Sequence, residues 1–157
     1  MPSDRYWRIN CTHEAGEDYV IIYEIEMRAT IGGADQTSTS NTIFSSEVNS
    51  SNEAANAFDD TNSSRWVSKH KTLDAAPWIG QDFGSAQTIA EITIYTDNGD
   101  RPPSAIEIQH SPDNSTWTTT DTYSGLTWSS GETKTFAVSS TGESVDLSAG
   151  SYYLTGS

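Results

Sequence analysis

The chain has 157 residues, of which 34% are hydrophobic and 10% aromatic, a composition that supports one folded domain with its own core. It carries 22 acidic side chains against 8 basic ones, which gives a net charge of −14. Because binding to a phosphate backbone needs clustered Lys and Arg, nucleic acid is not an expected partner. An anionic membrane surface is disfavoured for the same reason.

No apolar run reaches the roughly 18–20 residues of a transmembrane helix, so no membrane insertion is expected. An N-terminal signal peptide is not visible either. The single cysteine, Cys11, excludes an internal disulfide, so packing or a metal ion has to hold the domain together outside a cell. These features are typical of a product assembled in a cytoplasm and then released, as the parts of a virion are.

Short apolar runs separated by Ser, Thr, Gly, Asn and Asp predict an all-β fold with almost no helix. The first expected strand, Tyr6–Thr12, alternates so that Trp7 and Ile9 face inward. The second, Val20–Arg28, alternates likewise, and the loop His13–Asp18 would join the two as an antiparallel hairpin. The remaining expected strands are Thr42–Ser46, Trp78–Phe83, Thr88–Tyr95, Ala105–Ser111, Ser115–Thr120 and Thr133–Val138. About eight strands in two packed sheets predict a jelly-roll β-sandwich.

Two segments depart from this pattern. Ile31–Ser40 is rich in Gly, Ser and Thr, which predicts a flexible connector. Residues 139–157 form a polar C-terminal extension whose apolar patch, Tyr152–Leu154, could be an added strand or a contact with a neighbouring subunit. We therefore expect one domain over residues 1–138, followed by this extension.

The stretch AANAFDDTNSSRW, which ends at Trp66, resembles the A-x-x-A-F-D-G-(D/N)-x-x-T-x-W signature of discoidin domains, also known as coagulation-factor type C domains. Four further stretches agree with that family in order: Ser45-Ser46-Glu47, PWIGQDFG, AIEIQHSPDNSTW and GETKTF. The resemblance implies a galactose-binding-domain-like jelly-roll β-sandwich, the fold shared with family-thirty-two carbohydrate-binding modules.

The N-terminal residues 5–30 resemble the segment that normally closes a discoidin domain. We therefore interpret the chain as a circular permutant, in which this closing hairpin stands first and residues 31–40 link the old termini. Permutation is tolerated where the two termini of a domain lie close together. In this arrangement the chain looks most like modules of tailed-phage structural proteins.

The resemblance also implies a calcium site under the loop that follows the AFD stretch. The family positions fall on the side chains of Glu24, Asp59 and Ser64 and on the carbonyls of Tyr23, Asn56 and Thr61. Calcium prefers six to eight hard oxygen ligands, and two carboxylates would balance its charge. Asp60 stands where the family has Gly, which requires a left-handed backbone there, and Ser64 replaces a Thr. The alternative is a hydrogen-bonded loop in which Asp59 accepts backbone N–H groups.

A ligand site is implied in the loops at one end of the sandwich. The candidate side chains there are Lys69, His70, Asn98, Asp100, Arg101 and Trp128. Arg101 would donate to sugar hydroxyls, His70 would add a directional hydrogen bond, and Trp128 would be the stacking platform. Alternatively, these are ordinary polar loop residues, and Trp128 caps the core, as we expect of Trp66, Trp78 and Trp117.

No catalytic motif is found: the chain has neither a G-x-S-x-G elbow nor an H-E-x-x-H pair. We therefore expect a non-enzymatic component of a virion that attaches it to host-surface polysaccharide. The component would work as a homo-oligomer among other virion proteins, because repetition compensates for weak binding at each site. The alternative is a purely structural decoration or assembly domain without sugar binding.

Overall fold

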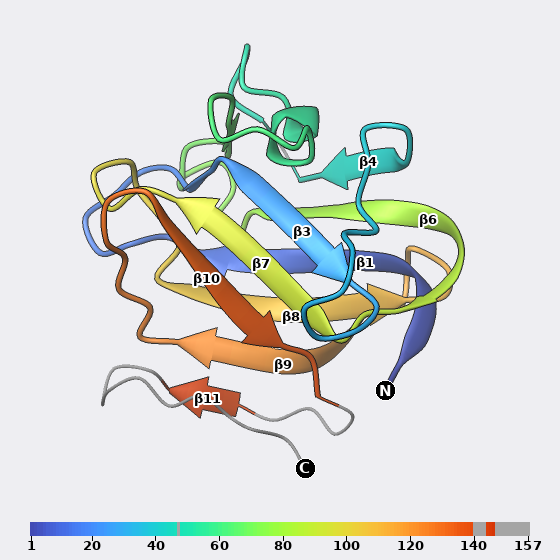
Figure 1. Ribbon diagram of the computed structural model, residues 1–157. Helices are drawn as coiled ribbons and strands as arrows, with labels where there is room; N and C mark the ends of the chain where they lie inside the picture. Colours follow the sequence, from blue (N-terminus) through green and yellow to red (C-terminus); the bar gives the residue numbers. More distant parts are fainter. Residues whose placement is uncertain (47, 140–143, 147–157) are drawn as a thin grey trace.

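The computed structural model describes residues 1–46, 48–139 and 144–146, and its two larger β-sheets pack face to face (Figure 1). The six-stranded sheet contains, in spatial order, β11 (Ser144–Asp146), β9 (Thr118–Ser124), β8 (Ala105–Ser111), β1 (Ser3–Thr12), β6 (Trp78–Thr88) and β4 (Thr42–Ser45). The three-stranded sheet contains β10 (Glu132–Ala137), β7 (Glu91–Thr96) and β3 (Glu24–Arg28). The expected all-β sandwich is confirmed.

Two small elements lie at one end of the sandwich. β2 (Ile21–Ile22) pairs antiparallel with β5 (Trp66–Val67), and η1 (Ala54–Ala57) is a single 3-10 turn. In the described part of the chain, no helix has the length and apolar character needed to cross a membrane.

The core lies between the two sheets and follows the alternation predicted from the sequence. β1 contributes Trp7 and Ile9, both fully buried, and β3 contributes Ile25 and Met27 from the opposite sheet. Each large apolar side chain buried in this way stabilises the fold by roughly 1.5–3 kcal/mol. Cys11 is buried beside them, and burial raises the pKa of its thiol, so it is a small core residue.

The predicted hairpin between the first two strands is wrong. β1 lies in the middle of the large sheet, where Arg8 is opposite Gly80 of β6 on one side and Gln109 of β8 on the other. β3 lies in the small sheet, where Ile25 is opposite Ile94 of β7. The intervening loop therefore crosses from one sheet to the other. Alternation identifies the residues that face the core, but it does not identify the sheet from which they face it.

Three strand boundaries also differ from expectation. The predicted strand Val20–Arg28 is divided at Tyr23 into β2 and β3, which lie in different sheets. The predicted strand Thr88–Tyr95 is divided at Ile89 and Ala90, where the chain leaves β6 in the large sheet and enters β7 in the small one. β9 begins at Thr118 rather than Ser115, because Asp113 Oδ1 accepts the N–H groups of Ser115 and Thr116 at 2.9 and 2.7 Å. These bonds hold the preceding residues in a loop.

The segment 31–40, expected as a flexible connector, is tied to both sheets by side-chain hydrogen bonds. Asp35 Oδ1 accepts the N–H of Met27 in β3 at 3.0 Å. Gln81 of β6, fully buried, accepts the N–H of Ser38 at 3.1 Å. Of the expected extension 139–157, only Ser139 and the backbone of β11 fall within the described residues, and β11 pairs parallel with β9.

Deleting residues 1–30 is expected to abolish the cooperative fold. The deletion removes β1 from between β6 and β8 and β3 from the edge of the small sheet, together with buried Trp7, Ile9, Ile25 and Met27. Thermal melting of the 31–157 fragment by circular dichroism tests this against the full chain. A soluble fragment with a single cooperative melt would contradict the expectation.

Candidate functional site

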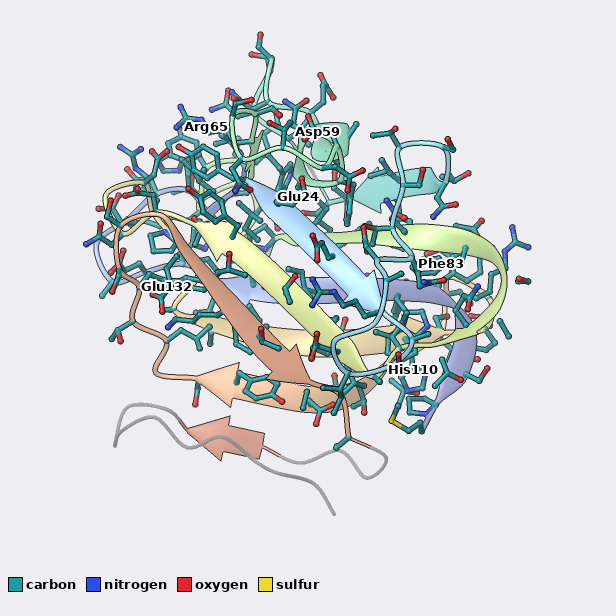
Figure 2. The ribbon with its side chains drawn as sticks, in the orientation of Figure 1. Glu24, Asp59, Arg65, Phe83, His110 and Glu132 are labelled. Carbon is teal, nitrogen blue, oxygen red and sulfur yellow. The ribbon has the colours of Figure 1, made fainter. Side chains whose placement is uncertain are left out.

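Two carboxylates meet at one end of the sandwich, Glu24 at the start of β3 and Asp59 in the loop after η1 (Figure 2). The N–H of Thr61 lies 3.1 Å from Glu24 Oε2 and 3.2 Å from Asp59 Oδ1, so both carboxylates share one donor. The hydroxyl of Ser64 donates to the other oxygen of Asp59. The structure thus brings together the side chains that the sequence assigns to a calcium site.

Glu24 stands in an electrostatically unfavourable position. Glu24 is only 6% exposed, and no residue in the described part of the chain makes a hydrogen bond to its buried Oε1. Burial, together with the negative charges of Asp59 and Asp60, raises the pKa of Glu24 to about 8. A buried, unpartnered carboxylate oxygen beside a second carboxylate is stabilised by a cation.

The backbone around this pair supports the same interpretation. Asp60 has φ 58°, the left-handed conformation that its place at a family glycine requires. Asn56 donates to the carbonyl of Arg65 at 3.1 Å, while the phenol of Tyr23 points to Asp100. In the described ranges, no three acidic, His or Cys side chains are placed so that they could hold a metal ion by themselves. Backbone and hydroxyl oxygens would therefore complete the coordination, and this hard-oxygen donor set fits calcium.

The hydrogen-bonded alternative for this loop is also partly present. Asp59 accepts the backbone N–H of Thr61, as that alternative expects. This bond uses one oxygen of Asp59 and leaves Glu24 Oε1 without a hydrogen-bond partner among the described residues. The alternative therefore explains the conformation of the loop but not the burial of Glu24.

A second group of candidates converges on the acidic loop between β1 and β2. Arg101 forms an ion pair with Glu17 at 2.9 Å, and its side chain is 45% exposed. Lys71 pairs with Asp18 at 2.9 Å, and His70 Nε2 lies 3.4 Å from the same carboxylate. Residues from three separate loops are thereby held at one end of the molecule.

Arg101 has an unusual backbone. Its φ is 57°, a left-handed conformation that is uncommon outside glycine. Its carbonyl accepts the N–H of Ile21 at 3.0 Å, which ties the loop to the strand end. Strain of this kind persists only where the surrounding structure determines it, and it is often found at functional positions.

The other predicted ligand residues have different surroundings. Asp100 is bound by Arg65 and by the hydroxyl of Tyr23. Asn98 is exposed, in the same loop as Arg101. Lys69 is half-buried, and its carbonyl accepts the hydroxyl of Ser68 at 2.9 Å. Asp100 therefore supports the loop, whereas Asn98 can still contact a ligand.

Trp128 is not an exposed stacking platform, so that prediction is wrong. It is 9% exposed, and its indole N–H donates to the carbonyl of Pro103 at 2.8 Å. It packs near Phe136, and the ammonium of Lys134 lies 5.2 Å from its ring centroid. The segment between β9 and β10 crosses from one sheet to the other, so an apolar side chain on it closes the core.

Of the three tryptophans expected to cap the core, one does so and two do not. Trp66 is fully buried, as expected of a core residue. Trp78 and Trp117, by contrast, are half-buried and lie against Arg8, outside the space between the sheets. Alternation places Arg8 on the opposite face of β1 from buried Trp7.

The sequence did not point to Tyr19, Glu17 or Asp18 as parts of the ligand loops. Tyr19 packs edge-on against His70 with ring centroids 5.4 Å apart. The visible signal is the acidic run around Gly16, which in so acidic a chain does not stand out. Its role depends on three loops that come together only in the fold.

Residues 36–154 match the family model of the F5/8 type C domain. The match covers most of the chain, and the β-sandwich and the AFD loop of the chain agree with this family. The protein therefore belongs to the F5/8 type C, or discoidin, family. Domains of this family are typically binding modules rather than catalysts, and carbohydrates are among their ligands. Comparisons with curated proteins and with solved structures give no significant match.

Replacing Trp128 by Ala is expected to lower the free energy of unfolding by about 3–5 kcal/mol, as for other buried aromatic side chains. Trp117→Ala is the matched control, because its half-buried ring should cost only about 1 kcal/mol. Urea unfolding of both variants gives the comparison. Equal costs, or a smaller cost for Trp128, would show that Trp128 does not belong to the core.

Proposed function

We propose that the chain is a non-catalytic module that binds host-surface polysaccharide through the loop end carrying His70 and Arg101. The observation that carries the proposal is the convergence of those side chains on one acidic loop, in a family of binding domains. Only Nε of Arg101 is used by Glu17, so further guanidinium donors are available for vicinal hydroxyls. Tyr19, packed against His70, supplies an aromatic surface in place of Trp128.

The charge of the chain favours an uncharged glycan. With a net charge of −14, long-range repulsion acts on sialylated or phosphorylated glycans, most strongly at low salt. At the loop end itself, Arg101 pairs with Glu17 and Lys71 with Asp18, so the charges of these two pairs balance. Neutral polymers of glucose or galactose are therefore the proposed ligands.

The proposal places this module in a virion, as a homo-oligomer beside other virion proteins. Support for the placement is the order of its N-terminal motifs, which resembles that of tailed-phage modules. Shallow sugar sites gain little net free energy after their hydroxyls are desolvated, so many displayed copies would supply the avidity. The competing proposal is a decoration or assembly domain that keeps the fold without binding sugar.

The proposal of a circular permutation rests on the position of the first strands. The family match begins at residue 36, after β1, β2 and β3. Yet β1 lies between β6 and β8, and β3 forms an edge of the small sheet, so both are integral to the sandwich. A closing segment moved to the front of the chain accounts for this arrangement.

Structural calcium is the third part of the proposal. Glu24, Asp59 and Ser64 would hold the ion with carbonyl oxygens of the same loop and of Tyr23. When bound, the ion would neutralise the two carboxylates and link β3 to the loop after η1. Support comes from the unpartnered Oε1 of Glu24 and from the donor that the two carboxylates share.

Chelation is expected to lower the melting temperature of the protein. An ion that binds the folded state alone adds about 2.7 kcal/mol of stability at a hundredfold excess over its dissociation constant. Asp59→Ala should remove the difference between melts with calcium and with chelator. Asp97→Ala, at a carboxylate in another loop, is the control and should keep it. An unchanged melt of the parent under both conditions would contradict the calcium proposal.

Arg101→Ala and His70→Ala are each expected to reduce binding to a neutral glycan array by at least about fivefold, with unchanged melting temperatures. Both side chains are partly exposed, and ion pairs that solvent reaches contribute little to stability. Lys134→Ala, on β10, is the control and should bind like the parent. If the multimerised parent binds no glycan and no host cell, the decoration alternative holds.

A further inference from the structure

Four aromatic side chains gather on the outer face of the six-stranded sheet, the face away from the core. They surround Arg8 of β1, and together these five residues are called the aromatic cluster: Tyr6, Arg8, Phe44, Trp78 and Trp117. The small sheet covers the opposite face, which is turned toward the viewer in Figure 1. An outer sheet face is usually polar, so this concentration of aromatic rings is unusual.

The cluster is one connected unit. The guanidinium of Arg8 lies 3.9 Å from the ring centroid of Trp117 and 4.8 Å from that of Trp78. The ring centroid of Phe44 lies 5.7 Å from that of Trp78 and 5.9 Å from that of Trp117. Tyr6 packs edge-on against Phe44, with ring centroids 6.3 Å apart. All five side chains are half-buried, so each keeps some surface open to solvent. The cluster therefore holds the half-exposed tryptophans, while Trp7, Trp66 and Trp128 are buried.

Arg8 is held in a fixed orientation without a direct ion pair among the described residues. Its Nε donates to Gln109 at 2.7 Å. Burial lowers the pKa of Arg8, against an opposing effect of Glu107. Stacking between indoles fixes the planar fork, so little side-chain entropy is lost when its remaining N–H groups bind an acceptor.

A row of polar side chains continues the cluster along the same face. Glu107 of β8 accepts the amide N–H groups of Asn10 and Gln109, at 3.3 and 3.0 Å. Strand pairing places these residues beside Arg8 on the outer face. The face therefore combines aromatic surface with oriented donors and acceptors, and a pyranose needs both for its C–H side and its hydroxyls.

Gly80 allows this arrangement. It lies opposite Arg8 on one side and Phe44 on the other. A Cβ atom there would lie 2.1 Å from the carbonyl oxygen of Trp7 and 2.6 Å from Cβ of Arg8. Because Gly80 has no side chain, the neighbouring strands can approach closely here. The aromatic rings of those strands can then meet above Gly80.

We propose that the aromatic cluster is a second carbohydrate site, which binds an uncharged glycan across the outer face of the large sheet. The inference rests on the proposed function, since it takes the same class of ligand, but it places the aromatic stacking away from the loop end. The structure buries Trp128, the expected platform of the loop end, and leaves Trp78 and Trp117 accessible.

Charge favours an uncharged glycan over the other occupants of such a face. The face is locally balanced, with Arg5 paired to Asp82 and Arg8 near Glu107. A second copy of the chain would also carry a net charge of −14, so the two copies would repel each other. A stable protein interface would also have to bury about 800 Å² on each side. A neutral sugar meets no such repulsion, and contact with a few aromatic rings is enough to bind it.

The test is an array of neutral glucose, galactose and mannose oligosaccharides, probed with the multimerised protein and four variants. Trp117→Ala and Arg8→Gln should each bind at least about tenfold more weakly than the parent. Tyr95→Ala, at a half-buried aromatic of the small sheet, is the matched control and should bind like the parent. Arg101→Ala reports on the loop end in the same experiment.

The outcomes separate this inference from the proposed function. A parent that binds no glycan overturns both. A parent that binds while Trp117→Ala and Arg8→Gln bind equally well overturns the second site and leaves the loop-end proposal standing. If Trp117→Ala instead abolishes a concentration-dependent dimer of the free protein, the cluster is a protein interface, and the second site is also overturned.

A measurement on the parent avoids any effect of substitution on folding. In a nitrogen-15 NMR titration with a bound oligosaccharide, the indole N–H signals of Trp78 and Trp117 should shift, and those of Trp7, Trp66 and Trp128 should not. Shifts confined to the loop-end backbone would overturn the second site.

Discussion

The structure depends on the pairing of β1 with two strands at once. β1 hydrogen-bonds to β6 on one side and to β8 on the other, so it joins two halves of the large sheet that are far apart in the sequence. Its inward side chains, Trp7 and Ile9, fill the centre of the core. Its outward side chain, Arg8, lies at the centre of the aromatic cluster. One strand therefore provides both the stability of the sandwich and the surface of the proposed second site.

The end of the sandwich that holds Glu24 and Asp59 shows how local structure and charge act together. In β3, Glu24 points away from the core that Ile25 and Met27 face. The left-handed backbone at Asp60 turns the loop after η1 back over Glu24. Neither carboxylate has a cationic partner among the described side chains. The same loop leads through Arg65 to Tyr23 and Asp100, which support the ligand loop of Arg101. A bound ion would thus rigidify a region that also positions the candidate ligand residues.

The sequence was sufficient for the fold class and for most inward-facing residues, because both follow from a period of two along each strand. It could not show that β1 and β3 belong to different sheets, since sheet membership depends on pairings with β6, β8 and β7. Family motifs located Asp59, Ser64 and Glu24, which the fold does bring together. They misplaced Trp128, because the sequence of a loop does not show whether its tryptophan packs inward.

Trp117 and Arg8 illustrate the opposite limit. They are 109 positions apart in the numbering and meet only because the loop before β9 folds over the outer face of β1. Nothing in either local sequence marks them as neighbours. The acidic loop at Glu17 and Asp18 is a similar case, since its meaning comes from Arg101, His70 and Lys71, which arrive from other loops.

Native-state hydrogen exchange of the β1 amides tests the central role of this strand most directly. If β1 joins the two halves of the large sheet, the amides of residues 6–12 exchange only through global unfolding. Their free energy of exchange then equals that of unfolding measured in denaturant. Exchange of these amides at a clearly lower free energy than those of β7 and β8 would show that β1 detaches from a sandwich that is stable without it, and would contradict the account.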